Sequence, residues 1–234
     1  MSQETVILLH GIIRNHFDMM LLEKRMKKEG YACINIKYPS TKHAIEDLAE
    51  QINTQLNQNE DYTRADKVHF VAHSMGGLIT RHILAKHRPA NLGSVVMLGT
   101  PNKGSEMADY LADHKYLATP FHFIFGPSAT QLRTAHKHFK DEVIDFPLGI
   151  IASDASLNPI GKQVFGAPND TLVSIESTKL EGMSDHIIIP CPHALMMFDP
   201  RIINQVAAFL KNGSFDHQEK SPAPQAKEPD EPAL

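Results

Sequence analysis

Tryptophan is absent from this chain of 234 residues, and cysteine is nearly so, with only Cys33 and Cys191. Two thiols are too few for the disulfide framework that stabilises small secreted domains or for a cysteine-based zinc site. No apolar run approaches the ~20 residues that a membrane-spanning helix needs. The net charge is only −4 and no basic run occurs, so nucleic acid is not an expected partner. We therefore expect a globular protein with reduced thiols.

Spacings that bind metals or nucleotides are also missing. Histidine occurs 14 times, yet no HExxH-type or paired Cys/His spacing is present, so no metal is expected. Neither GxGxxG nor GxxxxGK[ST] occurs, so no nucleotide cofactor is expected. The first residues lack the charged-then-apolar order of a secretory signal, which leads us to expect a cytoplasmic location.

Hydrophobic residues make up 42% of the chain and alternate between strand-like runs and helix-like periods. Strands are expected at residues 5–9, 31–38, 68–71, 94–98, 149–152, 172–175 and 187–189. Helices are expected at residues 18–29, 42–58 and 201–211, and another after residue 77. Strands that alternate with helices predict an α/β fold, with a mostly parallel central sheet and helices on both faces.

The segment KVHFVAHSMGGLI, residues 67–79, places Ser74 between a buried strand and the start of a helix. A serine on such a tight turn, with small residues two positions before and after it, is typical of a nucleophile elbow. Here those residues are Ala72 and Gly76, where the usual G-x-S-x-G pattern has two glycines. Ser74 is therefore the expected nucleophile, and the backbone N–H of Met75 is an expected oxyanion donor.

A serine nucleophile also needs a base and a second oxyanion donor, and both should follow the ends of strands. His10-Gly11-Ile12 follows the first strand directly, and the N–H of Ile12 is the expected donor. His193 lies between the last expected strand and the last helix, which is the position of the base. His73, beside the nucleophile, is expected to point away from it.

The acid that orients the base should follow a later strand, in the chain order Ser…Asp…His. Asp170 lies in the turn-forming segment Ala-Pro-Asn-Asp and is the expected acid, although an Asp in a turn can also serve only as a cap. Asp154, after the GIIA strand, and Asp185 are its rivals.

Two segments depart from the alternation of strands and helices. Residues 105–142 form either two helices that complete the core or a small helical cap over the active site. As a cap, this segment would contribute Phe121, Phe123 and Phe125 to an apolar substrate pocket. Residues 214–234 have little to bury and are expected to be a disordered tail after a single domain of residues 1–213.

Six blocks, from about residue 5 to residue 210, resemble the α/β-hydrolase superfamily, and within it the small bacterial lipases and esterases related to the lipase-like domains of GPI inositol-deacylases. The blocks are LLHGIIRN, YPS, VAHSMGGLITR, MLGTPNKGSEMAD, NDTLVSIEST and DHIIIPCPHALM. The resemblance implies Ser74, Asp170 and His193 as a catalytic triad, with Ile12 and Met75 as oxyanion donors. It also implies hydrolysis of a small-molecule carboxylic ester, with a lipid-like or short-chain acyl group, without a cofactor.

Two other functions stay open at this point. The same triad hydrolyses acyl thioesters, and the same fold can persist as a non-catalytic binding module. No pattern in the chain specifies the natural substrate, the acyl-chain length or the oligomeric state.

Overall fold

A six-stranded parallel sheet forms the centre of the molecule, in the order β2-β1-β3-β4-β5-β6. The computed structural model describes residues 3–136, 143–156, 164–165 and 167–218. The strands are β1 (Glu4–Leu9), β2 (Ala32–Asn35), β3 (Lys67–His73), β4 (Leu92–Leu98), β5 (Leu148–Ala152) and β6 (Asp185–Ile188). All of these pairings are parallel, which confirms the predicted sheet.

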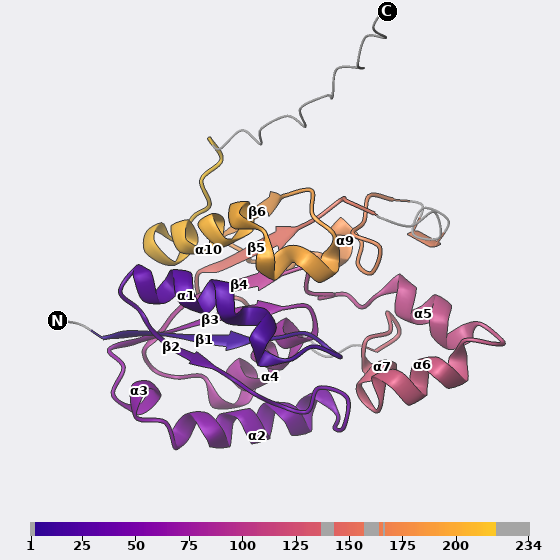
Figure 1. Ribbon diagram of the computed structural model, residues 1–234, viewed down its shortest axis with the longest axis horizontal. Coiled ribbons are helices and arrows are strands. Elements are labelled where there is room, and N and C mark those ends of the chain that lie inside the picture. The colour runs from indigo at the N-terminus through magenta and orange to yellow at the C-terminus, as the bar shows by residue number, and fades with distance from the viewer. Residues whose placement is uncertain (1–2, 137–142, 157–163, 166, 219–234) are drawn as a thin grey trace, which may run out of the picture.

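Helices cover both faces of this sheet (Figure 1). One layer contains α2 (Ile45–Asn57) and α4 (Met75–His87), and the other contains α1 (Met20–Lys28) and α10 (Pro200–Asn212). Side chains of a strand alternate between its two faces, so Ile7 and Leu9 pack into the first layer while Val6 and Leu8 pack into the second. The continuous apolar runs of the sequence therefore mark strands that are buried on both sides.

Three helices lie beyond the edge of the sheet at which the strands end (Figure 1). They are α5 (Glu106–Asp113), α6 (Ala118–Phe125) and α7 (Ser128–Gln131), and they occupy most of the predicted cap segment. Residues 137–142, at the end of that segment, lie outside the described residues. Shorter elements are η1 (His16–Met19), α3 (Glu60–Thr63), α9 (Ile175–Thr178) and η2 (His193–Phe198). Within the described ranges, no helix is both long enough and apolar enough to cross a membrane.

The strand predicted at residues 172–175 is wrong, because α9 begins at Ile175 and only an isolated bridge joins Asn169 to Ser174. Polar side chains hold this backbone in turns instead of in a ladder. Asp170 Oδ1 accepts hydrogen bonds from two following N–H groups, and Ser174 Oγ accepts one from Ser177 N.

The predicted tail also begins too early. Phe215 is buried against the second helix layer, and its N–H donates to Asp185 Oδ2 over 2.8 Å. Gln205 and Asp216 exchange two further hydrogen bonds. The chain is thus packed through Phe215, and residues 219–234 of the predicted tail lie outside the described residues.

Candidate active site

Ser74 occupies the turn between β3 and α4, with a backbone φ of 53° and ψ of −125°. L-residues rarely adopt a positive φ, so the turn is strained and must be held by its surroundings. Hydrogen bonds supply that support, because Ser74 N donates to Leu98 O over 2.8 Å and Gly77 N donates to Ser74 O over 2.9 Å. The serine side chain therefore stands at the junction of a central strand and a helix N-terminus.

Close packing explains the small residues around this turn. A Cβ added at Gly76 would lie 2.6 Å from Leu9 O, and one at Gly77 would lie 2.1 Å from Thr100 Oγ1. Ala72 is fully buried in the sheet between β1 and β4, where its methyl group is accommodated. The residues near Ser74 are thus small because larger side chains at Gly76 and Gly77 would clash with the ends of the adjacent strands.

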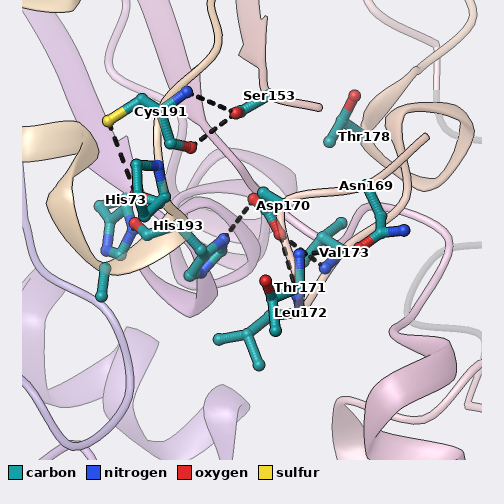
Figure 2. A network of polar contacts seen from close by, with 12 residues as sticks. His73, Ser153, Asn169, Asp170, Thr171, Leu172, Val173, Thr178, Cys191 and His193 are labelled. Carbon is teal, nitrogen blue, oxygen red and sulfur yellow. Dashed lines mark hydrogen bonds and ion pairs between the residues drawn. The ribbon is translucent and has the colours of Figure 1, made fainter. Parts of the chain in front are cut away.

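Asp170 and His193 form a buried pair beside the serine. The imidazole donates from Nδ1 to Asp170 Oδ2 over 2.6 Å, and both side chains are at most 5% exposed (Figure 2). The other carboxylate oxygen accepts from Leu172 N over 3.0 Å and from Val173 N over 2.8 Å. Three donors therefore orient this carboxylate, and the bond to Nδ1 fixes the tautomer that leaves Nε2 unprotonated.

One apolar cavity contains both Ser74 and His193. It opens to solvent, and the space within it, open solvent included, is about 420 Å³. The other lining residues are Ile12, Pro101, Ser105, Met107, Ala108, Leu111, Phe121, Phe125, Leu132, Leu172 and Val173. Among the described residues no hydrogen bond joins Ser74 Oγ to the imidazole. Such contacts are often long in unliganded enzymes and shorten when substrate binds.

Ile12 and Met75, the predicted oxyanion donors, lie near Ser74. Ile12 lines the cavity from the loop after β1. Met75 is the first residue of α4, so its N–H has no acceptor within the helix. Gly11 permits the approach of this loop, because a Cβ there would lie 2.9 Å from His73 Nδ1 and 3.1 Å from Ser74 Cβ.

Backbone strain is concentrated at these positions. Within the described ranges, the non-glycine residues with positive φ are Ile13, Ser74 and Thr171. They lie next to the Ile12 loop, at the serine itself and next to Asp170, respectively. Strained residues cluster at functional sites. The distribution of these three residues is therefore evidence for a functional site here, and this evidence does not depend on the cavity.

Phe121 and Phe125 line the cavity, but Phe123 does not. Its side chain is 88% exposed, whereas that of Phe121 is 4% exposed. In α6, residues four apart share a face and the residue midway between them points to the other side. The predicted place of Phe123 in the pocket is therefore corrected: it faces solvent.

The two rival acids lie elsewhere. Asp154 is exposed after β5, and within the described part of the chain no hydrogen bond or ion pair joins it to His193. Asp185 stands at the N-terminal end of β6, at the opposite edge of the sheet from the cavity, and binds Phe215 N and His217. Of the three candidates, Asp170 is the one beside the imidazole.

The ring of His73 packs against that of His193, with ring centroids 4.8 Å apart, and its predicted direction away from Ser74 stays a prediction. Its Nε2–H donates to His193 O over 3.0 Å (Figure 2). Arg14 binds the next residue of the same segment, since its Nη2 donates to Ala194 O over 2.9 Å. Neither contact could be found from the sequence, because each joins residues more than a hundred positions apart.

Ser153 is a further residue that the sequence did not indicate. Its hydroxyl donates to Cys191 O over 2.6 Å and accepts from Cys191 N over 2.9 Å, so it joins the end of β5 to the loop that carries His193 (Figure 2). Burial raises the pKa of the Cys191 thiol to about 12, so this sulfur stays protonated near neutral pH.

Among the described residues, no group of three or more His, Cys, Asp or Glu side chains could hold a metal ion.

Buried histidines make stability depend on pH, and His10 and His73 are among them. Burial lowers the pKa of His10, and it lowers the pKa of His73 well below the ordinary value of 6.5, with His193 acting in the same direction on His73. The unfolded chain binds protons at these imidazoles from about pH 6.5 downward, whereas the folded chain binds them only at lower pH. The free energy of unfolding therefore decreases as pH falls from about 6.5 toward the folded pKa values.

We expect the urea midpoint of unfolding to decrease as pH is lowered from about 7 to about 5. The midpoint of His73→Gln should decrease less steeply with pH than that of wild type. The glutamine amide can still donate to His193 O but does not titrate. Wild-type protein in the same buffers is the reference for this slope. An equal slope in wild type and His73→Gln would contradict this account.

Comparisons with known proteins bear on the family and the fold of the chain. The family model described as palmitoyl protein thioesterase matches residues 5–144, more than half of the chain. Triacylglycerol lipase 2 of Saccharomyces cerevisiae is 29% identical over 189 residues, which are 68% of this chain and 55% of that protein. A triacylglycerol lipase of Pseudarthrobacter phenanthrenivorans is 41% identical over 64 residues, 27% of this chain and 20% of its own. The chain thus spans about half or less of the length of these curated relatives.

Solved structures share the fold. Mature Bacillus licheniformis lipase BlEst2 matches with a TM-score of 0.73 at 18% identity, over 90% of this chain and 91% of that one. An esterase from Exiguobacterium antarcticum matches with a TM-score of 0.59 at 16% identity, over 90% and 92% of the two chains. The predicted α/β-hydrolase fold is therefore confirmed, and with it the resemblance to lipases and esterases.

Proposed function

Because the chain belongs to the palmitoyl protein thioesterase family, we propose that it is a serine hydrolase that cleaves carboxylic esters of lipid-like or short-chain acyl groups. One observation carries the proposal. The buried bond from His193 Nδ1 to Asp170 Oδ2 leaves the other imidazole nitrogen for Ser74. The side chains of Ser74 and His193 line the same cavity.

Ser74 Oγ attacks the acyl carbonyl while His193 Nε2 takes its proton, and Asp170 stabilises the imidazolium that forms. The N–H groups of Ile12 and Met75 hold the negative charge on the carbonyl oxygen. His193 then gives the proton to the leaving alcohol. Water attacks the acyl-enzyme by the same route and releases the acid.

Helices α5 to α7 act as the cap of a single hydrolase domain in this proposal. Their apolar side chains form one wall of the cavity, which suits an acyl chain better than a polar group. The acid half of the substrate would lie against Phe121 and Phe125, whose rings are 4.9 Å apart, while the alcohol half leaves toward solvent.

Turnover of nitrophenyl esters graded by chain length tests this proposal. Wild-type protein should hydrolyse them with a preference set by the cavity, and a folded protein that hydrolyses none would be a binding module instead.

The family match also favours a second candidate, hydrolysis of acyl thioesters. Matched oxygen and sulfur esters of one acyl chain decide between them, because a thioesterase has the higher kcat/KM on the sulfur ester.

Phe125→Ala is expected to shift the preference toward longer acyl chains, because it removes a ring from the cavity wall. One methylene in an apolar pocket changes kcat/KM by about 10-fold or more, so the shift should span at least one decade between short and long esters. Phe123→Ala removes an identical ring from the exposed face of the same helix and is the matched control. An unchanged preference in Phe125→Ala would exclude this wall from the acyl site.

A further inference from the structure

The start of the cap is fastened to the loop that carries the proposed catalytic acid. Ser105 Oγ donates to Leu172 O over 2.6 Å, and Lys103 N donates to Ser177 O over 3.0 Å. The Ser177 hydroxyl donates in turn to Gly104 O. Two segments that are about 70 residues apart in the sequence therefore meet at the base of α5.

Glu106 makes the side-chain bond at the centre of this contact. Ser174 Oγ donates to Glu106 Oε1 over 2.8 Å, and the same hydroxyl accepts from Ser177 N over 3.2 Å at the start of α9. Glu106 is the first residue of α5, where the helix dipole favours a carboxylate. Its second oxygen, Oε2, is buried and has no hydrogen-bond partner in the described structure. A buried carboxylate oxygen without a partner is costly, so this side chain is not optimised for stability alone.

The residues just before Ser174 orient Asp170. Both N–H groups that bind Asp170 Oδ1 belong to Leu172 and Val173, and Asp170 N donates to Val173 O over 3.2 Å. A shift of this short loop would therefore rotate the carboxylate that binds His193. Leu172 and Val173 also line the cavity, and so do three residues of α5 on the other side of the contact: Met107, Ala108 and Leu111. An acyl group in the cavity would therefore touch residues next to Glu106 and residues next to Ser174, but neither of those two side chains.

We propose that Glu106 is a positioning residue, which couples the cap to the catalytic acid through its hydrogen bond with Ser174. The inference rests on the proposed serine hydrolase function. When the acyl cavity is filled, the cap is held in place, and the Glu106–Ser174 bond transmits that position to the Asp170 loop. Turnover then depends on a side chain that touches neither the substrate nor the three reacting side chains.

Steady-state kinetics on a nitrophenyl ester that wild type hydrolyses test this coupling. Glu106→Ala is expected to lower kcat by roughly 10- to 100-fold with little change in KM, because a small misplacement of a catalytic group slows chemistry more than binding. Glu106→Gln should retain most of the activity, since its amide oxygen can accept the same bond. Ser174→Ala removes the same bond and also the bond from Ser177 N, so it should lose at least as much as Glu106→Ala. The double variant should be no worse than Ser174→Ala alone, because both substitutions remove the Glu106–Ser174 interaction.

Lys103→Ala is the matched control. It removes the pair between Lys103 and Glu176, which joins the same two segments but is at least half exposed on both sides, and exposed pairs contribute little. Its kcat should match wild type. If Glu106→Ala fails to fold, Ser174→Ala carries the same test. A wild-type kcat in folded Glu106→Ala or Ser174→Ala, or additive losses in the double variant, would overturn the coupling. Inactive wild-type protein would instead contradict the proposed function itself.

Discussion

Ser74→Ala is expected to abolish hydrolysis of a short-chain nitrophenyl ester while the protein stays folded. Loss of a serine nucleophile typically lowers kcat by about 10⁶-fold, and the residual rate comes from binding and oxyanion donors. The hydrogen bonds that hold the turn are made by the backbone of Ser74, so alanine keeps them. Initial rates measure the loss, and circular dichroism with a urea midpoint measures the fold.

The result has a clear alternative. Full turnover by folded Ser74→Ala would move the chemistry to another residue. Ser105 is the other serine that lines the cavity, but its hydroxyl already donates to Leu172 O and accepts from Ala108 N. Ser105→Ala removes the hydroxyl of that serine together with its bond to Leu172 O, and we expect it to lose far less activity than Ser74→Ala.

Asp170→Asn is expected to lower kcat by about 10⁴-fold, the effect of this change in a serine–histidine–aspartate triad. The cause is the tautomer. An asparagine amide can present N–H to His193 Nδ1, which leaves the proton on Nε2 and removes the base that faces Ser74. The carboxylate also accepts two backbone bonds through Oδ1, which the amide oxygen can still accept, so the loop should persist.

Asp154→Asn and Asp185→Asn are matched controls for this prediction, because each replaces one carboxylate by an amide, as Asp170→Asn does. Asp154 follows β5, and Asp185 is the first residue of β6. Neither side chain contacts the imidazole, so both variants should keep wild-type kcat. A loss of activity in Asp154→Asn with active Asp170→Asn would exchange the proposed roles of the two acids.

The sequence was most informative where burial alone decides the structure. Apolar runs such as residues 5–9 and 94–98 predicted parallel strands, because strands covered on both faces have few polar residues. Parallel strands end at one edge of the sheet, so the loops after β1 and β3 and the loop before η2 were expected to meet. The structure brings Ile12, Ser74 and His193 to one cavity, although their roles stay predictions.

Other features depended on contacts that no local pattern contains. Phe121, Phe123 and Phe125 are spaced as residues on one face of a strand would be, and only the helical conformation of α6 separates the exposed Phe123 ring from the two rings that line the cavity. Phe215 packs because Asp185, 30 residues earlier, accepts its N–H. The run at residues 172–175 has strand-like composition, but side-chain acceptors within it and before it satisfy its backbone and prevent a ladder.

Reaction with a fluorophosphonate probe tests the central claim most directly, because such probes need a serine that a base has activated. We predict one adduct on the native protein, located at Ser74 by mass spectrometry of the labelled peptide. Labelling should disappear in urea and slow greatly in Asp170→Asn. Native protein that hydrolyses esters without labelling at Ser74, or that labels equally fast in the unfolded state, would contradict the account.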